Sequence, residues 1–275
     1  GFGCNVPAIM AARQIENPRD RTLTMLMIPF MSCSARLPVY LLFVSAFFAD
    51  FKALVMIGLY ATGIILSILF AYVMKHTKWF RMQDEDYVSV LPPFRKPTWR
   101  NTGMHIWERV NDYLKKISTV ILAASVIIWA LEYFPADKTD NGANPEESYL
   151  AMIGKAVSPV MEPLGFDWKM NVSLLTGLPA KEAIVSTMGI LYHTDSTDED
   201  NANLATVLRE EKIFTPANSW SFMLFVLLYF PCVATVTTLR KEIGGKWAAF
   251  TVVNSLVMAW LAAFLAFRVL SLIIV

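Results

Sequence analysis

Several stretches of the chain are apolar over the length of a membrane-spanning helix. A bilayer core needs about 20 apolar residues of helix. Residues 52–73, 220–239 and 247–267 meet that length, and residues 117–134 nearly meet it, with a polar helix running into them. We therefore predict an all-α, polytopic membrane domain whose helices are joined by polar segments.

One apolar stretch, residues 22–48, is interrupted near its middle by Pro29, Arg36 and Pro38. Proline removes a backbone N–H and ends or kinks a helix. Within a membrane the freed backbone groups must find other partners, and transporters place their substrates at such breaks. The pattern predicts a broken helix with backbone carbonyls available to a ligand.

A second interrupted stretch, residues 171–192, is predicted to enter the membrane and return. Residues 75–116 are rich in Lys and Arg, so the positive-inside rule places them in the cytoplasm. The acidic segments 135–169 and 193–217 then both lie outside. Two outside loops in succession cannot flank one complete crossing, so we expect a re-entrant hairpin that turns at the Gly and Pro near its centre.

The Lys- and Arg-rich segment ends in an amphipathic helix. Apolar side chains form one face at helical spacing and charged side chains form the other: Ile106, Val110, Leu114 and Ile117 against Glu108, Arg109, Asp112, Lys115 and Lys116. We favour a helix that lies on the membrane surface over a partner-binding helix.

Composition supports a membrane protein and excludes other classes. Hydrophobic residues make up 55% of the chain and charged residues 17%, whereas a soluble domain carries about a quarter charged residues. The net charge of +1 argues against a nucleic-acid partner, which would favour a basic surface. Three cysteines cannot all pair, so a disulfide framework is not expected.

Each of the three cysteines lies where Gly, Pro or hydroxyl residues interrupt an apolar segment. Cys4 follows two glycines and precedes a proline, Cys33 lies between two serines, and Cys232 follows Pro231. Thiolate is a ligand for soft and borderline metal ions. A thiol at a helix break therefore suggests that the substrate is a metal ion.

The two halves of the chain resemble each other weakly. In each half a Gly-to-Pro-Ala turn precedes a helix that breaks at Pro and Cys, which pairs Cys33 with Cys232. Interrupted segments at matching places in two halves indicate a transporter site between repeats.

These motifs resemble the FeoB-type ferrous iron transporters of bacteria. The most specific is PFMSCSARLPVY at residues 29–40, and together the motifs cover essentially the whole chain: residues 3–11, 15–21, 29–40, 171–177, 179–182, 185–189 and 229–235.

The resemblance implies two Gate-type repeats with broken and re-entrant helices in a multi-pass protein of the bacterial inner membrane. Residues 1–74 would be the end of the first repeat and the central membrane region. Residues 75–116 would be the cytoplasmic loop and amphipathic helix, and residues 117–275 the second repeat and terminal helix. The chain opens inside a motif, so we expect it to be part of a longer protein.

The resemblance also implies ferrous iron import by the permease part of a GTPase-linked transporter. We expect no enzyme activity and no cofactor in this chain, because its Gly-Gly-Lys-Trp at residues 244–247 lacks the spacing of a phosphate-binding loop. GTP and Mg²⁺ would belong to a cytoplasmic GTPase domain of the same protein. The other expected partners are Fe(II) and the lipid bilayer; a small accessory protein and further copies of the chain remain open.

Fe(II) needs a site that binds well enough to strip water and still releases the ion, for which mixed sulfur and oxygen ligands are suited. The candidate ligands are three thiols, three hydroxyls and one carboxylate: Cys33, Cys232, Cys4, Ser32, Ser34, Thr235 and Glu182. Each has a structural alternative. A cysteine can be an apolar filler, a hydroxyl can satisfy backbone groups, and Glu182 can pair with Lys181. We interpret Arg36 as structural.

Two other functions stay open on the sequence. A permease for an organic solute such as a nucleoside would use the hairpin tips for hydrogen bonding and leave the cysteines incidental. A non-transporting, metal-sensing membrane subunit would bind Fe(II) without passing it.

Overall fold

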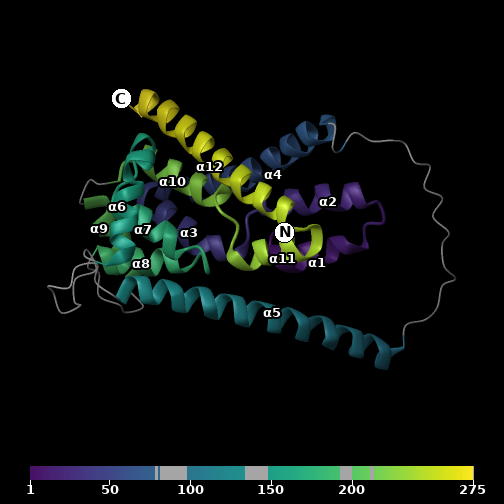
Figure 1. Ribbon diagram of the computed structural model, residues 1–275. Helices are drawn as coiled ribbons and strands as arrows, with labels where there is room; N and C mark the ends of the chain where they lie inside the picture. The colour runs from purple at the N-terminus through teal and green to yellow at the C-terminus, as the bar shows by residue number, and fades with distance from the viewer. Residues whose placement is uncertain (78–79, 81–97, 134–147, 193–199, 211–213, 275) are drawn as a thin grey trace.

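The computed structural model describes residues 1–77, 80, 98–133, 148–192, 200–210 and 214–274. Within these ranges the chain is helical and contains no strand (Figure 1), which confirms the all-α prediction. Residues 78–79 and 81–97 of the predicted cytoplasmic segment lie outside the described residues, as do residues 135–147, 193–199 and 211–213 of the two acidic segments on which the membrane orientation was predicted. The rest of both acidic segments is described and is largely helical.

Twelve α-helices, with short 3-10 turns between some of them, are found in the described residues. They are α1 (Asn5–Ala11), α2 (Pro18–Met27), α3 (Leu37–Phe47), α4 (Lys52–His76), α5 (Trp99–Tyr133), α6 (Tyr149–Met161), α7 (Trp168–Thr176), α8 (Ala183–Leu191), α9 (Asp200–Glu210), α10 (Pro216–Leu228), α11 (Val233–Ile243) and α12 (Gly245–Ile274).

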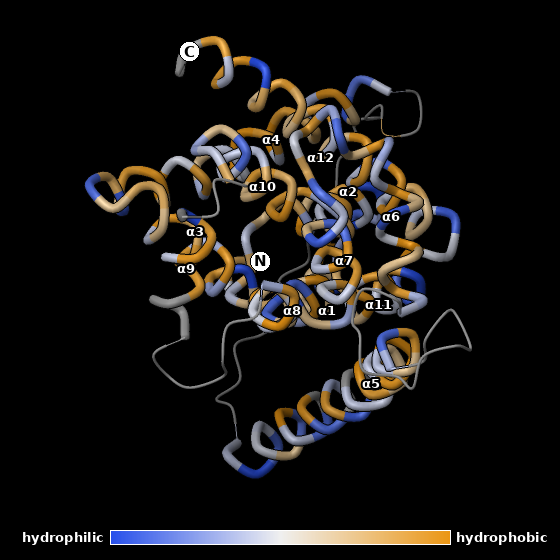
Figure 2. The backbone as a smooth tube through the Cα atoms, turned by 90° about the vertical axis from the view of Figure 1, so that its left-hand side faces the viewer, coloured by the Kyte–Doolittle hydropathy of each residue, from blue (hydrophilic) through white to orange (hydrophobic). Residues whose placement is uncertain are grey.

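In the part of the chain that the structure describes, five helical segments are long and apolar enough to cross a membrane: Pro18–Phe47, Ala49–His76, Trp99–Tyr133, Pro216–Ile243 and Gly245–Leu272. They include all four of the apolar stretches predicted from the sequence. The amphipathic segment and the apolar stretch after it form one continuous helix, α5. Figures 1 and 2 show α5 running along one side of the bundle, apart from the other long helices.

The first and fourth of these segments are broken helices. Between α2 and α3 the chain makes a 3-10 turn at Ile28–Phe30, an extended stretch at residues 31–33 and a second 3-10 turn at Ser34–Arg36. Between α10 and α11 it is extended from Tyr229 to Cys232. Both breaks contain a proline, as the sequence predicted.

Helices α7 and α8 form the predicted hairpin. The Asp167 side chain accepts a hydrogen bond from the Met170 N–H and caps the start of α7. The Tyr192 hydroxyl donates to Asp167 over 3.2 Å, and the Lys169 ammonium donates to the Leu191 carbonyl over 3.1 Å. The end of α8 therefore lies beside the start of α7, and the turn between them occupies the other end of the hairpin.

Helix α10 forms the centre of the core. Its side chains are buried along nearly the whole helix, and it packs against α3, α4 and α12. Phe222 contacts Phe43 and Phe166, with ring centroids 5.0 Å and 5.5 Å apart. In contrast, α4, α5 and α12 carry exposed large apolar side chains along their length, as expected of helices that face lipid.

Helix α4 packs closely against the first break. Gly63 is buried there, and a Cβ atom on it would lie 2.9 Å from the Phe30 carbonyl oxygen. Because the neighbouring atom belongs to the backbone, it cannot move away by a change of side-chain rotamer. The absence of a side chain at this position therefore lets α4 support the broken helix directly.

We expect Gly63→Ala to lower the stability of the protein by about 1–3 kcal/mol, the usual cost of overpacking a core. Thermal unfolding in detergent measures the change. Gly58→Ala on the same helix is the control, because its Cβ would meet only Trp220, at 3.7 Å. Equal unfolding temperatures for the two variants would contradict the close packing described here.

Candidate metal-ion site

Two of the three cysteines lie at equivalent places in the two broken helices. Cys33 directly precedes the 3-10 turn that leads into α3, and Cys232 directly precedes α11. Both are half-buried free thiols with extended backbone. Cys4, at the start of α1, is an exposed free thiol.

Each break is tied to a turn elsewhere in the chain by the same backbone hydrogen bond. The N–H of Ser34 donates to the Gly3 carbonyl over 3.0 Å, and the N–H of Val233 donates to the Leu178 carbonyl over 3.3 Å. In both cases the donor is the residue after the cysteine. The backbone therefore relates the two breaks as the weak sequence repeat predicted.

In each break, a buried basic side chain donates a hydrogen bond to the backbone carbonyl two residues before the cysteine. The Arg36 guanidinium donates to the Met31 carbonyl over 2.9 Å, and the Lys181 ammonium donates to the Phe230 carbonyl over 2.8 Å. Arg36 and Lys181 are only 1% and 2% exposed. Cations suit these positions because the C-terminal ends of helices carry partial negative charge.

The two breaks lie close to a common centre. The 3-10 turn at Ile28–Phe30 in the first break packs against α10, the helix that leads into the second break. The Lys181 ammonium lies at the second break, on the Phe230 carbonyl. It also lies over the Tyr229 ring, 3.3 Å from the ring centroid. Gly177 lets the hairpin turn approach this ring, because a Cβ there would lie 2.7 Å from the Tyr229 hydroxyl.

The predicted hydroxyl ligands lie beside their cysteines. The Thr235 hydroxyl is buried, 3.1 Å from the Cys232 sulfur. The Ser32 hydroxyl is buried, whereas the exposed Ser34 hydroxyl donates to the Gly3 carbonyl over 3.0 Å. Each break thus combines a thiol with hydroxyl and carbonyl oxygens.

The other two predicted ligands lie at the margin of this centre. Glu182 is exposed, whereas its neighbour Lys181 is buried. The Cys4 sulfur lies 3.9 Å from the hydroxyl of Tyr113 on α5. Helix α5, which carries Tyr113, also packs against α11, the helix that follows the second break.

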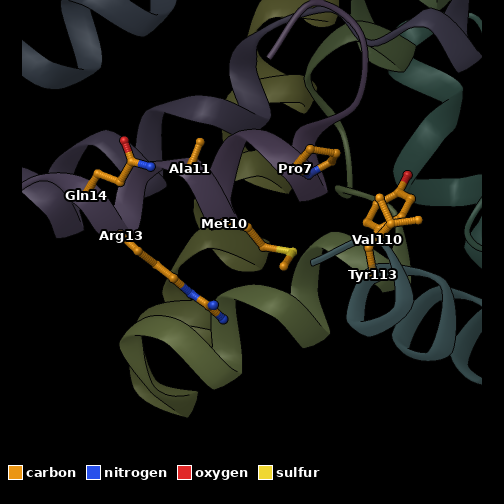
Figure 3. A pocket seen from close by; sticks show the side chains of 7 residues that line it. All are labelled: Pro7, Met10, Ala11, Arg13, Gln14, Val110 and Tyr113. Carbon is orange, nitrogen blue, oxygen red and sulfur yellow. The ribbon is translucent and has the colours of Figure 1, made fainter. Parts of the chain in front are cut away.

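A pocket of about 400 Å³ opens between α1 and α5 (Figure 3). Val110 and Tyr113 of α5 form one wall, and the other lining residues come from α1 and the 3-10 turn after it: Pro7, Met10, Ala11, Arg13 and Gln14. One of these lining residues, Tyr113, is also the residue whose hydroxyl lies beside the Cys4 sulfur.

Within the described ranges, no group of three or more His, Cys, Asp and Glu side chains could hold a metal ion. Side-chain donors of these types therefore do not form a closed metal cage there. A cation that binds between the breaks would need hydroxyl and backbone oxygens in addition to sulfur. Such an open ligand set suits an ion that passes through rather than one that stays.

An ion pair joins the two halves away from this centre. Arg13, in the 3-10 turn after α1, binds Glu242 near the end of α11 through two hydrogen bonds, one of them 2.6 Å from Nε to Oε2. Glu242 is largely shielded from solvent, at 10% side-chain exposure. The pair supports the packing of α1 against α11.

The fold and the paired breaks define a membrane protein built from two broken-helix repeats. The Gate family model, described as nucleoside recognition, matches residues 1–47 and 114–246. A second model, described as the C terminus of ferrous iron transport protein B, matches residues 56–109. No solved structure matches the chain.

Three relatives cover nearly the whole chain. It is 44% identical to the Fe(2+) transport protein A/Fe(2+) transporter FeoB fusion protein of Porphyromonas gingivalis, over 98% of the chain and 37% of that protein. It is 41% identical to the Fe(2+) transporter FeoB of Staphylococcus aureus, over 98% and 39%, and 40% identical to that of Campylobacter jejuni, over 100% and 46%.

The chain belongs to the Gate family and, with these relatives, to the FeoB-type proteins, matching their C-terminal membrane region. It spans less than half the length of these curated relatives. Its five membrane-length helices and its family make it a multi-pass protein of the inner membrane.

We expect Glu242→Gln to destabilise the protein by about 1–3 kcal/mol, because the Arg13 guanidinium loses its charged acceptor in a partly buried place. Unfolding in detergent measures the loss. Glu108→Gln is the control, since Glu108 forms only an exposed pair with His105 and such pairs contribute about 0–1 kcal/mol. A loss no larger than that of the control would show that the pair does not hold the halves together.

Proposed function

We propose that the chain is the permease part of a ferrous iron importer. The observation that carries the proposal is the pair of thiols, Cys33 and Cys232, at equivalent helix breaks. The names of the relatives, which are Fe(2+) transporters, point to the ion.

The ion would pass between the two repeats. Cys33 and Cys232 would each supply one sulfur, and Ser32 and Thr235, which lie beside them, would supply hydroxyl oxygens. Fe(II) binds such ligands more weakly than Cu(II) or Zn(II) does. Because each helix break would supply only a few ligands, the ion could both bind and leave, as conduction requires.

Cys4 would belong to the approach rather than to the centre. It is exposed, it lies beside Tyr113, and the pocket between α1 and α5 adjoins it. Glu182, exposed next to the hairpin turn, would attract cations toward the same region. GTP hydrolysis would be carried out by a GTPase domain elsewhere in the full-length protein, and this chain would itself catalyse no reaction.

Cys33→Ser and Cys232→Ser should each lower Fe(II) uptake about tenfold or more, because a hydroxyl is a harder and weaker ligand than a thiolate. The measurement is uptake of radioactive iron by cells that make the full-length protein, at equal expression. Cys4→Ser is the matched control and should have a smaller effect. Unchanged uptake by both Cys33→Ser and Cys232→Ser would show that these thiols do not bind the transported ion.

One other function is favoured by a specific observation. The Gate family model carries the description nucleoside recognition, and the pocket of about 400 Å³ beside α1 is large enough for part of an organic solute. In that case both serine variants would transport normally and Fe(II) would not be taken up. A subunit that senses metal without transport would bind Fe(II) in liposomes but not carry it inside.

A further inference from the structure

Lys181 lies in an unusual place for a charged side chain. It is 2% exposed, in the turn of the hairpin between α7 and α8. Burying an ammonium group is costly unless other groups compensate its charge. Among the described residues, no carboxylate forms an ion pair with it. The compensation comes instead from a backbone carbonyl and an aromatic ring.

The carbonyl in question is a natural ligand for a cation. Phe230 lies in the extended stretch after α10, where the following Pro231 has no N–H, and its carbonyl is two residues before Cys232. The Lys181 ammonium donates a 2.8 Å hydrogen bond to this carbonyl. A metal ion held by the Cys232 sulfur would find its nearest freed carbonyl already bound to a positive charge.

The two buried cations differ in where they come from. Arg36 binds the carbonyl of Met31 within its own broken helix, five residues away. Lys181 reaches the second break from the hairpin, 49 residues away in sequence. Lys181 can therefore leave its carbonyl if the hairpin turn shifts against α10 and α11, whereas Arg36 stays with its own break.

Electrostatic repulsion also opposes binding of the ion next to the Lys181 ammonium. The Lys181 ammonium and a divalent ion held by the Cys232 sulfur would be two positively charged groups at the same helix break. Repulsion between like charges is strong where water is excluded. An ion and the Lys181 ammonium at its present place would therefore disfavour each other.

We propose that Lys181 is a tethered cation that competes with the transported ion for the Phe230 carbonyl. This inference rests on the proposed role of Cys232 as an ion ligand. Binding of the ion moves the ammonium off the carbonyl, and return of the ammonium helps to expel the ion. Lys181 is thus a residue that sets affinity and release, not a ligand.

The test compares Lys181→Met with Lys169→Met in the full-length protein in lipid nanodiscs, with Fe(II) added alone under anaerobic conditions. Lys181→Met keeps the apolar stem and removes the charge. Lys169 is the matched control, because it also binds a backbone carbonyl from the same hairpin, but at the opposite end. Equilibrium binding gives the dissociation constant of each variant.

We expect Lys181→Met to bind Fe(II) about tenfold more tightly than the wild type, since the ion no longer displaces a charged hydrogen-bond donor. Lys169→Met should bind as the wild type does. In uptake assays Lys181→Met should lower both KM and the maximal rate, because the ion leaves more slowly. Structural damage would not tighten binding, so the direction of the change distinguishes the two causes.

Unchanged or weaker Fe(II) binding by Lys181→Met would overturn the inference. Cys232→Ser in the same assay separates this from failure of the proposed function. If Cys232→Ser weakens binding and Lys181→Met does not tighten it, the competition alone is wrong. If Cys232→Ser leaves binding unchanged, the ion site itself is wrong. Should Lys181→Met fail to fold, Lys181→Gln removes the charge while keeping a donor, with the same expected direction.

Discussion

The structure depends on one constraint, which is that backbone groups freed inside a membrane must be satisfied by the protein itself. Both broken helices meet it in the same way. The N–H after each cysteine binds a carbonyl from a distant turn, and the carbonyl two residues before each cysteine binds a buried cation. The breaks are therefore held open in a defined shape, and each thiol is placed between a satisfied donor and a satisfied acceptor.

These bonds also explain how two halves of a chain with little sequence similarity make one centre. Gly3 holds the first break, and Leu178 holds the second, so each break is supported by a turn outside its own helix. The hairpin is closed at the end opposite its turn by Asp167, Lys169 and Tyr192, which hold the start of α7 beside the end of α8. Gly63 then lets α4 rest on the first break.

Much of this fold was predictable from the sequence, because proline, glycine and hydropathy act locally. The spans, both breaks, the hairpin and the pairing of Cys33 with Cys232 all follow from such signals. The groups that hydrogen-bond to the two helix breaks could not be predicted in this way, because they depend on which side chains tertiary packing buries. Glu182 and Lys181 are adjacent in an apolar stretch, and nothing in their spacing tells which one turns inward. Tyr113 is far from Cys4 in sequence, and only the course of α5 brings them together.

The cations at the breaks have a consequence for how the protein folds. In a structural metal site the ion supplies the free energy that holds its ligands together, so that chelators unfold the protein. Here Arg36 and Lys181 satisfy the carbonyls of Met31 and Phe230 from within the chain. The shape of the two breaks is therefore held by the chain's own side chains and does not depend on a bound metal ion.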